Sequence, residues 1–178
     1  MPARRILLSG LALLACATAA LAHGPSRQKV TETVVIDAPA EKVWAAIGNF
    51  QDMSWHPAFA SQEGQGGNTP DSATRKLTLQ VGGVLEETLT KYSAADRSYS
   101  YRIEKVDVKV LPVNNYSSTI TVSEAGGKST VEWRGAFYRG YLNNEPPPEL
   151  NDEAAVKAVS GVYRGGLDAL KAKIETGK

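Results

Sequence analysis

Arg75 and Glu87 are the charged residues whose positions come closest to those of a chemical site. Each lies in a segment of alternating apolar residues, Arg75 ahead of Leu77, and Glu87 between Leu85 and Leu89. Alternate residues of a strand share a face, so both charged side chains are predicted to point inward. Because a buried charge requires a partner, they are predicted to form either a polar anchor or base in a cavity, or an ion pair at its open rim.

Six aromatic side chains fall on the same predicted inward face. Rings that carry hydroxyl groups suit a pocket that holds an apolar ligand and orients it through a few polar contacts. The same rings would equally fill a hydrophobic core, and the sequence leaves both interpretations open. With Arg75 and Glu87 they make up the candidate ligand cavity: Tyr99, Tyr101, Tyr116, Trp133, Phe137 and Tyr163.

Trp55 and His56 are predicted to lie at the rim of this cavity. His56 is the only histidine after His23, and one histidine cannot build a zinc site, so no metal is predicted. His56 could act as an acid or base, or form a hydrogen bond at a helix end. The sequence has no nucleophile motif, phosphate loop or dinucleotide fingerprint, so no catalytic residue and no cofactor are assigned.

The segment over residues 137–148 reads as a long exposed loop after its first two residues. Its three final prolines favour a stiff polyproline II conformation. Tyr, Arg and Asn side chains on a stiff exposed loop are typical of a protein-recognition surface, and the alternative is a stiff linker. The candidate partner-binding residues are Tyr138, Arg139, Tyr141, Asn143 and Asn144.

A long amphipathic helix is predicted over residues 152–174. Asn151 or Asp152 can cap its start, and the prolines before it prevent an earlier one. Glycines in its middle indicate either close packing on a sheet or a hollow between helix and sheet. Apolar residues recur at steps of three and four: Val156, Val159, Tyr163, Leu167, Leu170 and Ile174.

The remaining segments predict an antiparallel sheet with one helical insertion. A two-residue turn at Gly82 and Gly83 would place neighbouring apolar sets on opposite faces, so a three-residue loop is predicted. The fold class is therefore α+β, with a curved antiparallel sheet wrapped around the C-terminal helix. The expected elements are strand 29–37, a helix opening at 38–41, a short helix or turn over 53–59, a loop or weak strand end over 63–72, strands 75–81, 85–92, 99–103, 116–122 and 131–137, and an extended segment 107–113.

Residues 1–22 have the pattern of a secretory signal peptide. Two arginines precede an apolar run that ends in a small-x-small cleavage pattern at Ala22, and the run is too short for a membrane span. Cleavage leaves residues 23–178 as a single secreted domain. Cys16 lies in a box that resembles a lipoprotein site, but the apolar run continues past it to the better site.

The charge balance argues against two classes of partner. The 20 basic residues fall to 18 without Arg4 and Arg5, against 19 acidic residues, which gives a net charge of −1. No block of like charge stands out, so neither nucleic acid nor an anionic membrane surface is predicted as a partner.

The order of strand, helix, antiparallel meander and long final helix resembles the helix-grip fold of the START-like (SRPBCC, Bet v 1-like) superfamily. Residues 37–44 resemble the beginning of that fold, and residues 55–57 resemble a segment that follows its helix pair. The superfamily includes plant pollen allergens and polyketide cyclases. The resemblance implies a helix-grip fold for the whole of residues 23–178.

Three separate segments of the sequence resemble the MxaD-type proteins of methylotrophic bacteria. They are residues 22–25, 111–118 and 135–153. This resemblance implies a non-enzymatic periplasmic accessory protein of methanol oxidation, with methanol dehydrogenase and/or its cytochrome c acceptor as partners. It supplies no catalytic residue. The alternatives are a carrier of a small hydrophobic ligand, and a cyclase-like enzyme that uses Glu87 or a tyrosine as its base.

Overall fold

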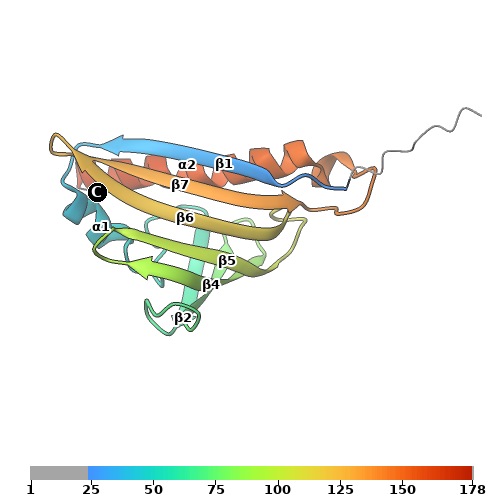
Figure 1. The fold of residues 1–178 in the computed structure, drawn as a ribbon, viewed down its shortest axis with the longest axis horizontal. Coiled ribbons are helices and arrows are strands. Elements are labelled where there is room, and N and C mark those ends of the chain that lie inside the picture. The colour runs from blue at the N-terminus through green and yellow to red at the C-terminus, as the bar shows by residue number, and fades with distance from the viewer. Residues whose placement is uncertain (1–23, 178) are drawn as a thin grey trace, which may run out of the picture.

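Seven antiparallel strands and two α-helices make up the fold of residues 24–177, the part of the chain that the computed structural model describes (Figure 1). The strand order in the sheet is β1-β7-β6-β5-β4-β3-β2. Within residues 24–177, no helix is both long enough and apolar enough to cross a membrane. The elements are β1 (Gln28–Ile36), α1 (Ala40–Ile47), β2 (Phe59–Gln65), β3 (Thr74–Leu79), β4 (Val84–Ser93), β5 (Ser98–Val106), β6 (Val113–Ala125), β7 (Lys128–Arg139), a 3-10 turn η1 (Pro148–Leu150) and α2 (Asp152–Thr176).

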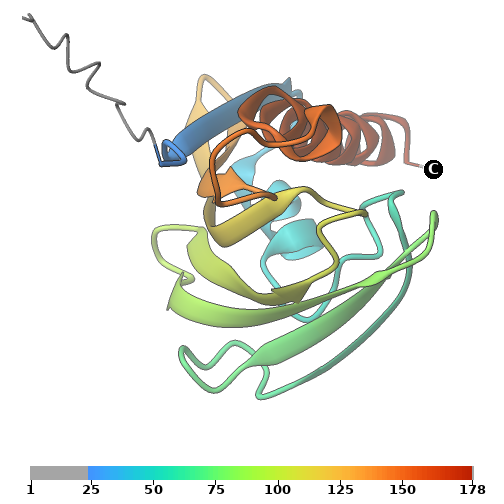
Figure 2. The same cartoon turned by 90° about the vertical axis from the view of Figure 1, so that its right-hand side faces the viewer.

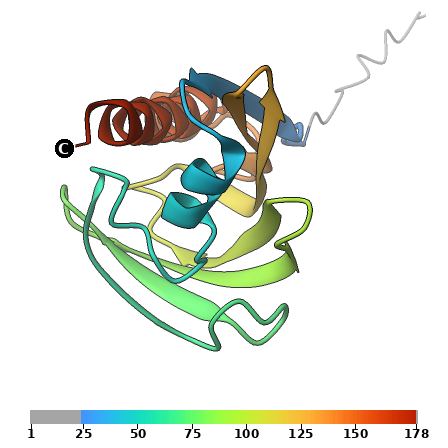
Figure 3. The ribbon, with the colours of Figure 1, turned by 90° about the vertical axis from the view of Figure 1, so that its left-hand side faces the viewer.

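The sheet is curved, and both helices lie on its inner side (Figures 2 and 3). The predicted fold class is therefore confirmed. Helix α2 begins at Asp152 because the side chain of Asn151 accepts a hydrogen bond from the Ala154 amide at 2.8 Å. It ends before Gly177, whose φ of 67° is the left-handed conformation that closes many helices. The predicted signal peptide and Cys16 lie outside the described residues.

Helix α2 packs along β1 and β7 and buries the apolar stripe expected from the sequence, including Val159, Tyr163 and Leu167. It also covers the β1 edge of the sheet. Arg164 donates to the Thr33 carbonyl at 3.1 Å, and Lys171 Nζ donates to the Val35 carbonyl at 2.7 Å. Because these carbonyls have no further strand to pair with, the two cations protect the β1 edge from pairing with another chain.

The register of the β3–β4 hairpin confirms the predicted three-residue loop. Leu77 lies opposite Leu85, and the Leu79 amide donates to the Gly83 carbonyl at 3.1 Å. Residues 80–82 form the loop, with Gly82 at a φ of 89°. This register places Arg75 directly opposite Glu87.

Two segments differ from the prediction. Strand β2 runs from the end of the short helix or turn expected over residues 53–59 into the loop or weak strand end expected over residues 63–72. This strand sits at the edge of the sheet with most of its residues exposed, so it lacks the apolar alternation that reveals a strand. The segment expected to be extended over residues 107–113 is a turn, because the Val110 and Leu111 amides both donate to the Asp107 carbonyl.

Candidate functional site

The eight residues predicted to line a cavity are all buried and at most 5% exposed. They come from β3, β4, β5, β6, β7 and α2, so the curvature of the sheet brings together residues that lie far apart in the sequence. They divide into an ion pair, a hydrogen-bonded set of hydroxyl and indole groups, and the packed rings of Tyr99 and Phe137.

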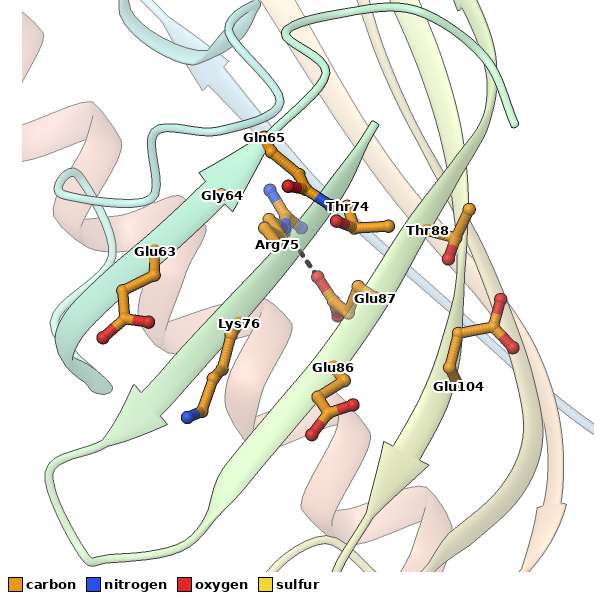
Figure 4. A pocket seen from close by; sticks show the side chains of 10 residues that line it. All are labelled: Glu63, Gly64, Gln65, Thr74, Arg75, Lys76, Glu86, Glu87, Thr88 and Glu104. Carbon is orange, nitrogen blue, oxygen red and sulfur yellow. Dashed lines mark hydrogen bonds and ion pairs between the residues drawn. The ribbon is translucent and has the colours of Figure 1, made fainter. Parts of the chain in front are cut away.

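Arg75 and Glu87 form an ion pair across the neighbouring strands β3 and β4 (Figure 4). Arg75 Nε lies 2.6 Å from Glu87 Oε2, and Nη1 donates to the Phe50 carbonyl at 2.6 Å. The guanidinium also lies over the rings of Phe50 and Tyr101, at 4.2 and 4.9 Å from their centroids. Burial raises the pKa of Glu87, while Arg75 opposes that rise. The pair therefore lies within the core and not at an open rim.

A chain of hydrogen bonds joins the polar atoms of the aromatic cluster. The hydroxyls of Tyr116 and Tyr163 are 2.5 Å apart, and Ser118 Oγ lies 2.9 Å from the Tyr163 hydroxyl. Trp133 Nε1 donates to Ser118 Oγ at 2.9 Å and to the Tyr101 hydroxyl at 3.1 Å. Burial raises the pKa of Tyr101 and Tyr116 well above the ordinary value for tyrosine, so both phenols stay protonated at neutral pH.

Little space remains between these side chains. The cavity that they leave has a volume of about 20 Å³, which is close to the room that one water molecule needs. Tyr99, Phe137 and Tyr163 do not line it. The rings thus form a packed core in this structure. Five of the eight predicted residues line this small inner cavity: Arg75, Glu87, Tyr101, Tyr116 and Trp133.

A larger apolar groove of about 520 Å³ opens beside this core. It lies between the middle of α2, the segment before β2, the tip of the β3–β4 hairpin and the turn before β6. Phe59, Leu85, Leu111 and Val162 line both the groove and the inner cavity, so these four side chains separate them. The other residues of the groove are His56, Pro57, Ala58, Leu79, Val81, Val110, Ala158, Gly161 and Gly165.

The glycines of α2 have two different roles, and each matches one of the two interpretations left open by the sequence. A Cβ added at Gly161 or Gly165 would meet no other atom within 4 Å, so these two glycines leave the groove open. A Cβ added at Gly166 would lie 2.6 Å from His56 Nε2 and 3.1 Å from the Trp133 ring. Gly166 therefore allows close packing of the helix on His56.

His56 is held at the inner wall of the groove by two hydrogen bonds. Its Nδ1 accepts from the Ala58 amide at 3.1 Å, which places the proton on Nε2, and Nε2 donates to the Val162 carbonyl at 2.9 Å. His56 lines the groove but is only 3% exposed, and it does not line the small inner cavity whose rim was predicted for it. Trp55 does not line the groove and packs on Trp133 inside the core, with ring centroids 5.8 Å apart.

We expect the stability of the protein to fall as the pH drops below about 6.5 because of His56. Burial lowers the pKa of His56, so the unfolded chain takes up a proton at a pH where the folded protein does not. The slope from this residue is at most about 1.4 kcal/mol per pH unit. Urea unfolding between pH 5 and pH 8 measures it, and His56→Gln should flatten the profile. A profile that is identical in both proteins would contradict this role.

The candidate partner-binding loop requires one correction. Arg139 was expected to be exposed but is only 7% exposed, because its guanidinium turns back onto the loop. It donates to the carbonyls of Tyr141 and Asn143 at 2.7 and 3.0 Å, and to Asp152 at 3.1 Å. Arg139 therefore braces the loop. Tyr138 and Tyr141 are half-buried, while Asn143 and Asn144 are exposed.

Groups of three or more His, Cys, Asp or Glu residues that could hold a metal ion are absent from residues 24–177. The groove has no charged lining residue, so it offers an apolar wall with one buried imidazole. Apart from His56 and the glycines of α2, the residues of the groove were not predicted to line a ligand site. The signal that could have found them is the spacing of Gly161 and Gly165, which places both on one face of the helix.

The fold and the core define the class of protein. Residues 27–175 match the family described as "Polyketide cyclase / dehydrase and lipid transport", and the chain belongs to this family. It is a START-like protein, in which a curved antiparallel sheet grips a C-terminal helix. A search of curated proteins finds no significant match.

Several solved structures are similar to this chain. The protein XoxI from Bacillus cereus is 32% identical, with a TM-score of 0.68, and the match covers 82% of this chain and 94% of XoxI. A protein from Nitrosospira multiformis is 29% identical, with a TM-score of 0.67 and coverage of 83% and 96%. Norcoclaurine synthase from Thalictrum flavum, solved with dopamine and hydroxybenzaldehyde, shares the fold at 14% identity, a TM-score of 0.62 and coverage of 99% of each chain.

Proposed function

We propose that this protein is a non-enzymatic periplasmic accessory protein of methanol oxidation that binds methanol dehydrogenase, or its cytochrome c acceptor, through the loop over residues 140–147. The observation that supports this proposal best is the bracing of the loop by Arg139. The resemblance of residues 135–153 to MxaD-type proteins supplies the identity of the partner, and the similarity to XoxI is consistent with it.

The loop is ordered before any partner arrives. Arg139 holds it from inside, the Asn114 side chain donates to the Arg139 and Gly140 carbonyls at 3.1 and 2.8 Å, and the Tyr141 amide donates to the Leu150 carbonyl at 3.1 Å. A pre-ordered loop loses little conformational entropy on binding, which favours affinity. The tip of the loop then presents Leu142, which is 44% exposed, beside two exposed asparagines.

The packed interior supports a role at the surface. A cavity of about 20 Å³ has no room for an organic substrate, and the buried tyrosines stay protonated, which makes them poor bases. Neither condition favours a reaction inside the helix-grip core.

We expect Asn143→Ala/Asn144→Ala to weaken the binding of methanol dehydrogenase about tenfold or more, because the exposed tip would lose its polar contacts. Arg139→Ala should weaken binding as well, because the loop would lose its brace. Surface plasmon resonance with purified methanol dehydrogenase and cytochrome c measures both, and Lys157→Ala on the exposed face of α2 serves as the control. Equal affinity of all variants for both candidate partners would rule out the loop as the binding surface.

A second candidate function is favoured by the groove of about 520 Å³. Its volume and uncharged walls suit a small apolar ligand, so the protein would then be a carrier. The ligand would lie against α2 over Gly161 and Gly165, outside the four side chains that close the inner cavity.

We expect Gly161→Leu/Gly165→Leu to abolish ligand binding in the groove while the protein remains folded. Both positions are exposed and have open space above them, so the new side chains would occupy the groove and not the core. The neutral fluorophore N-phenyl-1-naphthylamine reports binding by its rise in fluorescence. No rise with the wild-type protein, or the same rise with the variant, would exclude the groove as a binding site for this class of ligand.

A further inference from the structure

The outer face of the sheet carries a cationic hollow beside the loop. Its volume is about 440 Å³, and it lies over β1, β7, β6, β5 and β4, the strands that Figure 1 shows side by side, with α2 behind β1 and β7. Lys29, Lys91 and Arg134 line it, and none of its lining residues carries a carboxylate. Most of the rest are serines and threonines, including a Ser100–Thr119 pair whose hydroxyls are 2.8 Å apart.

These cations are not neutralised by neighbours. Lys29 and Lys91 form no ion pair with any carboxylate of residues 24–177. Arg134 has only an exposed contact of 3.9 Å with Glu132, which contributes little. The neighbouring hollow in Figure 4 differs, because Glu63, Glu86 and Glu104 line it beside one exposed lysine, Lys76. Glu86 and Glu104 form ion pairs with Lys105 and Arg102, so that hollow is of mixed charge, whereas the hollow around Lys29, Lys91 and Arg134 is lined by cations alone.

The spread of the cations indicates the kind of partner. Lys29 lies on β1 and Lys91 on β4, four strand steps apart in the sheet, which is about 19 Å at the usual strand spacing. A single phosphate or carboxylate is bound by donors that converge on it within about 3 Å. Charges distributed over this width match several carboxylates on one surface, as the acidic face of a folded protein provides.

The cationic hollow is continuous with the loop. Arg27 donates to Ser117 Oγ at 3.2 Å, and Ser117 lines the hollow. The same guanidinium lies over the ring of Tyr138, 5.7 Å from its centroid. Tyr138 immediately precedes the bracing residue Arg139, so the two surfaces meet at this point.

We propose that the outer face of the sheet around Lys29, Lys91 and Arg134 is a docking surface for an acidic face of the protein partner. The proposal rests on the proposed function only for the identity of that partner. Positive charge on this face attracts the partner during encounter, and the adjoining loop then makes the close contacts. Such attraction acts mainly on the association rate and weakens with salt.

The first test compares two double variants with the same change of charge. Lys29→Glu/Lys91→Glu should lower the association rate with methanol dehydrogenase or cytochrome c about tenfold or more at ~0.01 M ionic strength, and the difference should shrink at ~0.15 M. Lys157→Glu/Lys173→Glu changes two exposed lysines of α2 that form no ion pair within residues 24–177, and it should leave the rate within about twofold of wild type. Equal rates for the two double variants would overturn the proposal.

A second test does not depend on the identity of the partner, so it separates this proposal from the proposed function. Titration of the isotope-labelled protein with a poly-glutamate peptide should shift the amide signals of Lys29, Lys91, Arg134 and residues 117–119. Shifts confined to other regions, an equally strong response to inorganic phosphate, or a response only to phosphatidylglycerol vesicles would overturn it. If these signals shift but neither candidate partner binds, the docking surface stands and the proposed function fails.

Discussion

Replacement of Glu87 by alanine is expected to lower the free energy of unfolding by about 3–5 kcal/mol. The substitution would leave the Arg75 guanidinium, 2% exposed, without its carboxylate partner. The remaining hydrogen bond to the Phe50 carbonyl and the contacts with two aromatic rings do not neutralise the charge. Urea denaturation of wild type and variant at pH 7 measures the difference.

Two further variants define what the Glu87 result means. Glu86→Ala removes a carboxylate from the adjacent position of β4, where the side chain is partly exposed and faces Lys105, and it should change stability by less than about 1 kcal/mol. Arg75→Met/Glu87→Leu removes both charges and should recover most of the loss, since an apolar pair of similar volume is often as stable as a buried ion pair. A loss below about 1 kcal/mol for Glu87→Ala would show that Arg75 reaches solvent.

Alanine substitutions at two neighbouring glycines of α2 are expected to change the stability of the protein in opposite directions. Gly166→Ala should destabilise the protein by about 1–3 kcal/mol, because the new methyl group would collide with His56 and Trp133 in a well-packed core. Gly165→Ala should stabilise it by about 0.5–1 kcal/mol, because the position is exposed, has free space, and alanine favours the helix. Thermal unfolding of the two variants beside wild type provides the measurement.

The position of His56 gives this pair of variants a second readout. If Gly166→Ala displaces the imidazole, its hydrogen bonds to Val162 and Ala58 are lost, and the pH dependence of stability should resemble that of His56→Gln. A stabilising effect of Gly166→Ala would contradict the close contact between α2 and His56.

Much of the fold could be predicted because alternating patterns report which face of the sheet a side chain occupies. The inward positions of Arg75 and Glu87 follow from this parity together with the loop length at Gly82. The alternating pattern does not, however, show how much space is left between the side chains that share a face. Whether the rings of Tyr101, Tyr116 and Trp133 surround a cavity or fill it depends on how tightly α2 approaches the sheet, and only the structure shows that distance.

The prediction that Arg139 is exposed was wrong, although the sequence contained a signal for its burial. Arg139 shares the parity of Phe137 and Gly135, so extension of the last predicted strand by two residues would have placed it on the inner face. Strand β2 offered no comparable signal, since an exposed edge strand needs no apolar side chains. The cationic hollow could not be predicted either, because Lys29, Lys91 and Arg134 meet only once the order of the strands is known.

Native mass spectrometry of the purified protein mixed with methanol dehydrogenase, and separately with cytochrome c, tests most directly whether this helix-grip protein acts through its surface. We predict a complex with one of the two proteins, no small molecule bound to the free chain, and loss of the complex in Asn143→Ala/Asn144→Ala. A chain that carries a tightly bound small molecule and forms no complex with either protein would contradict the proposal.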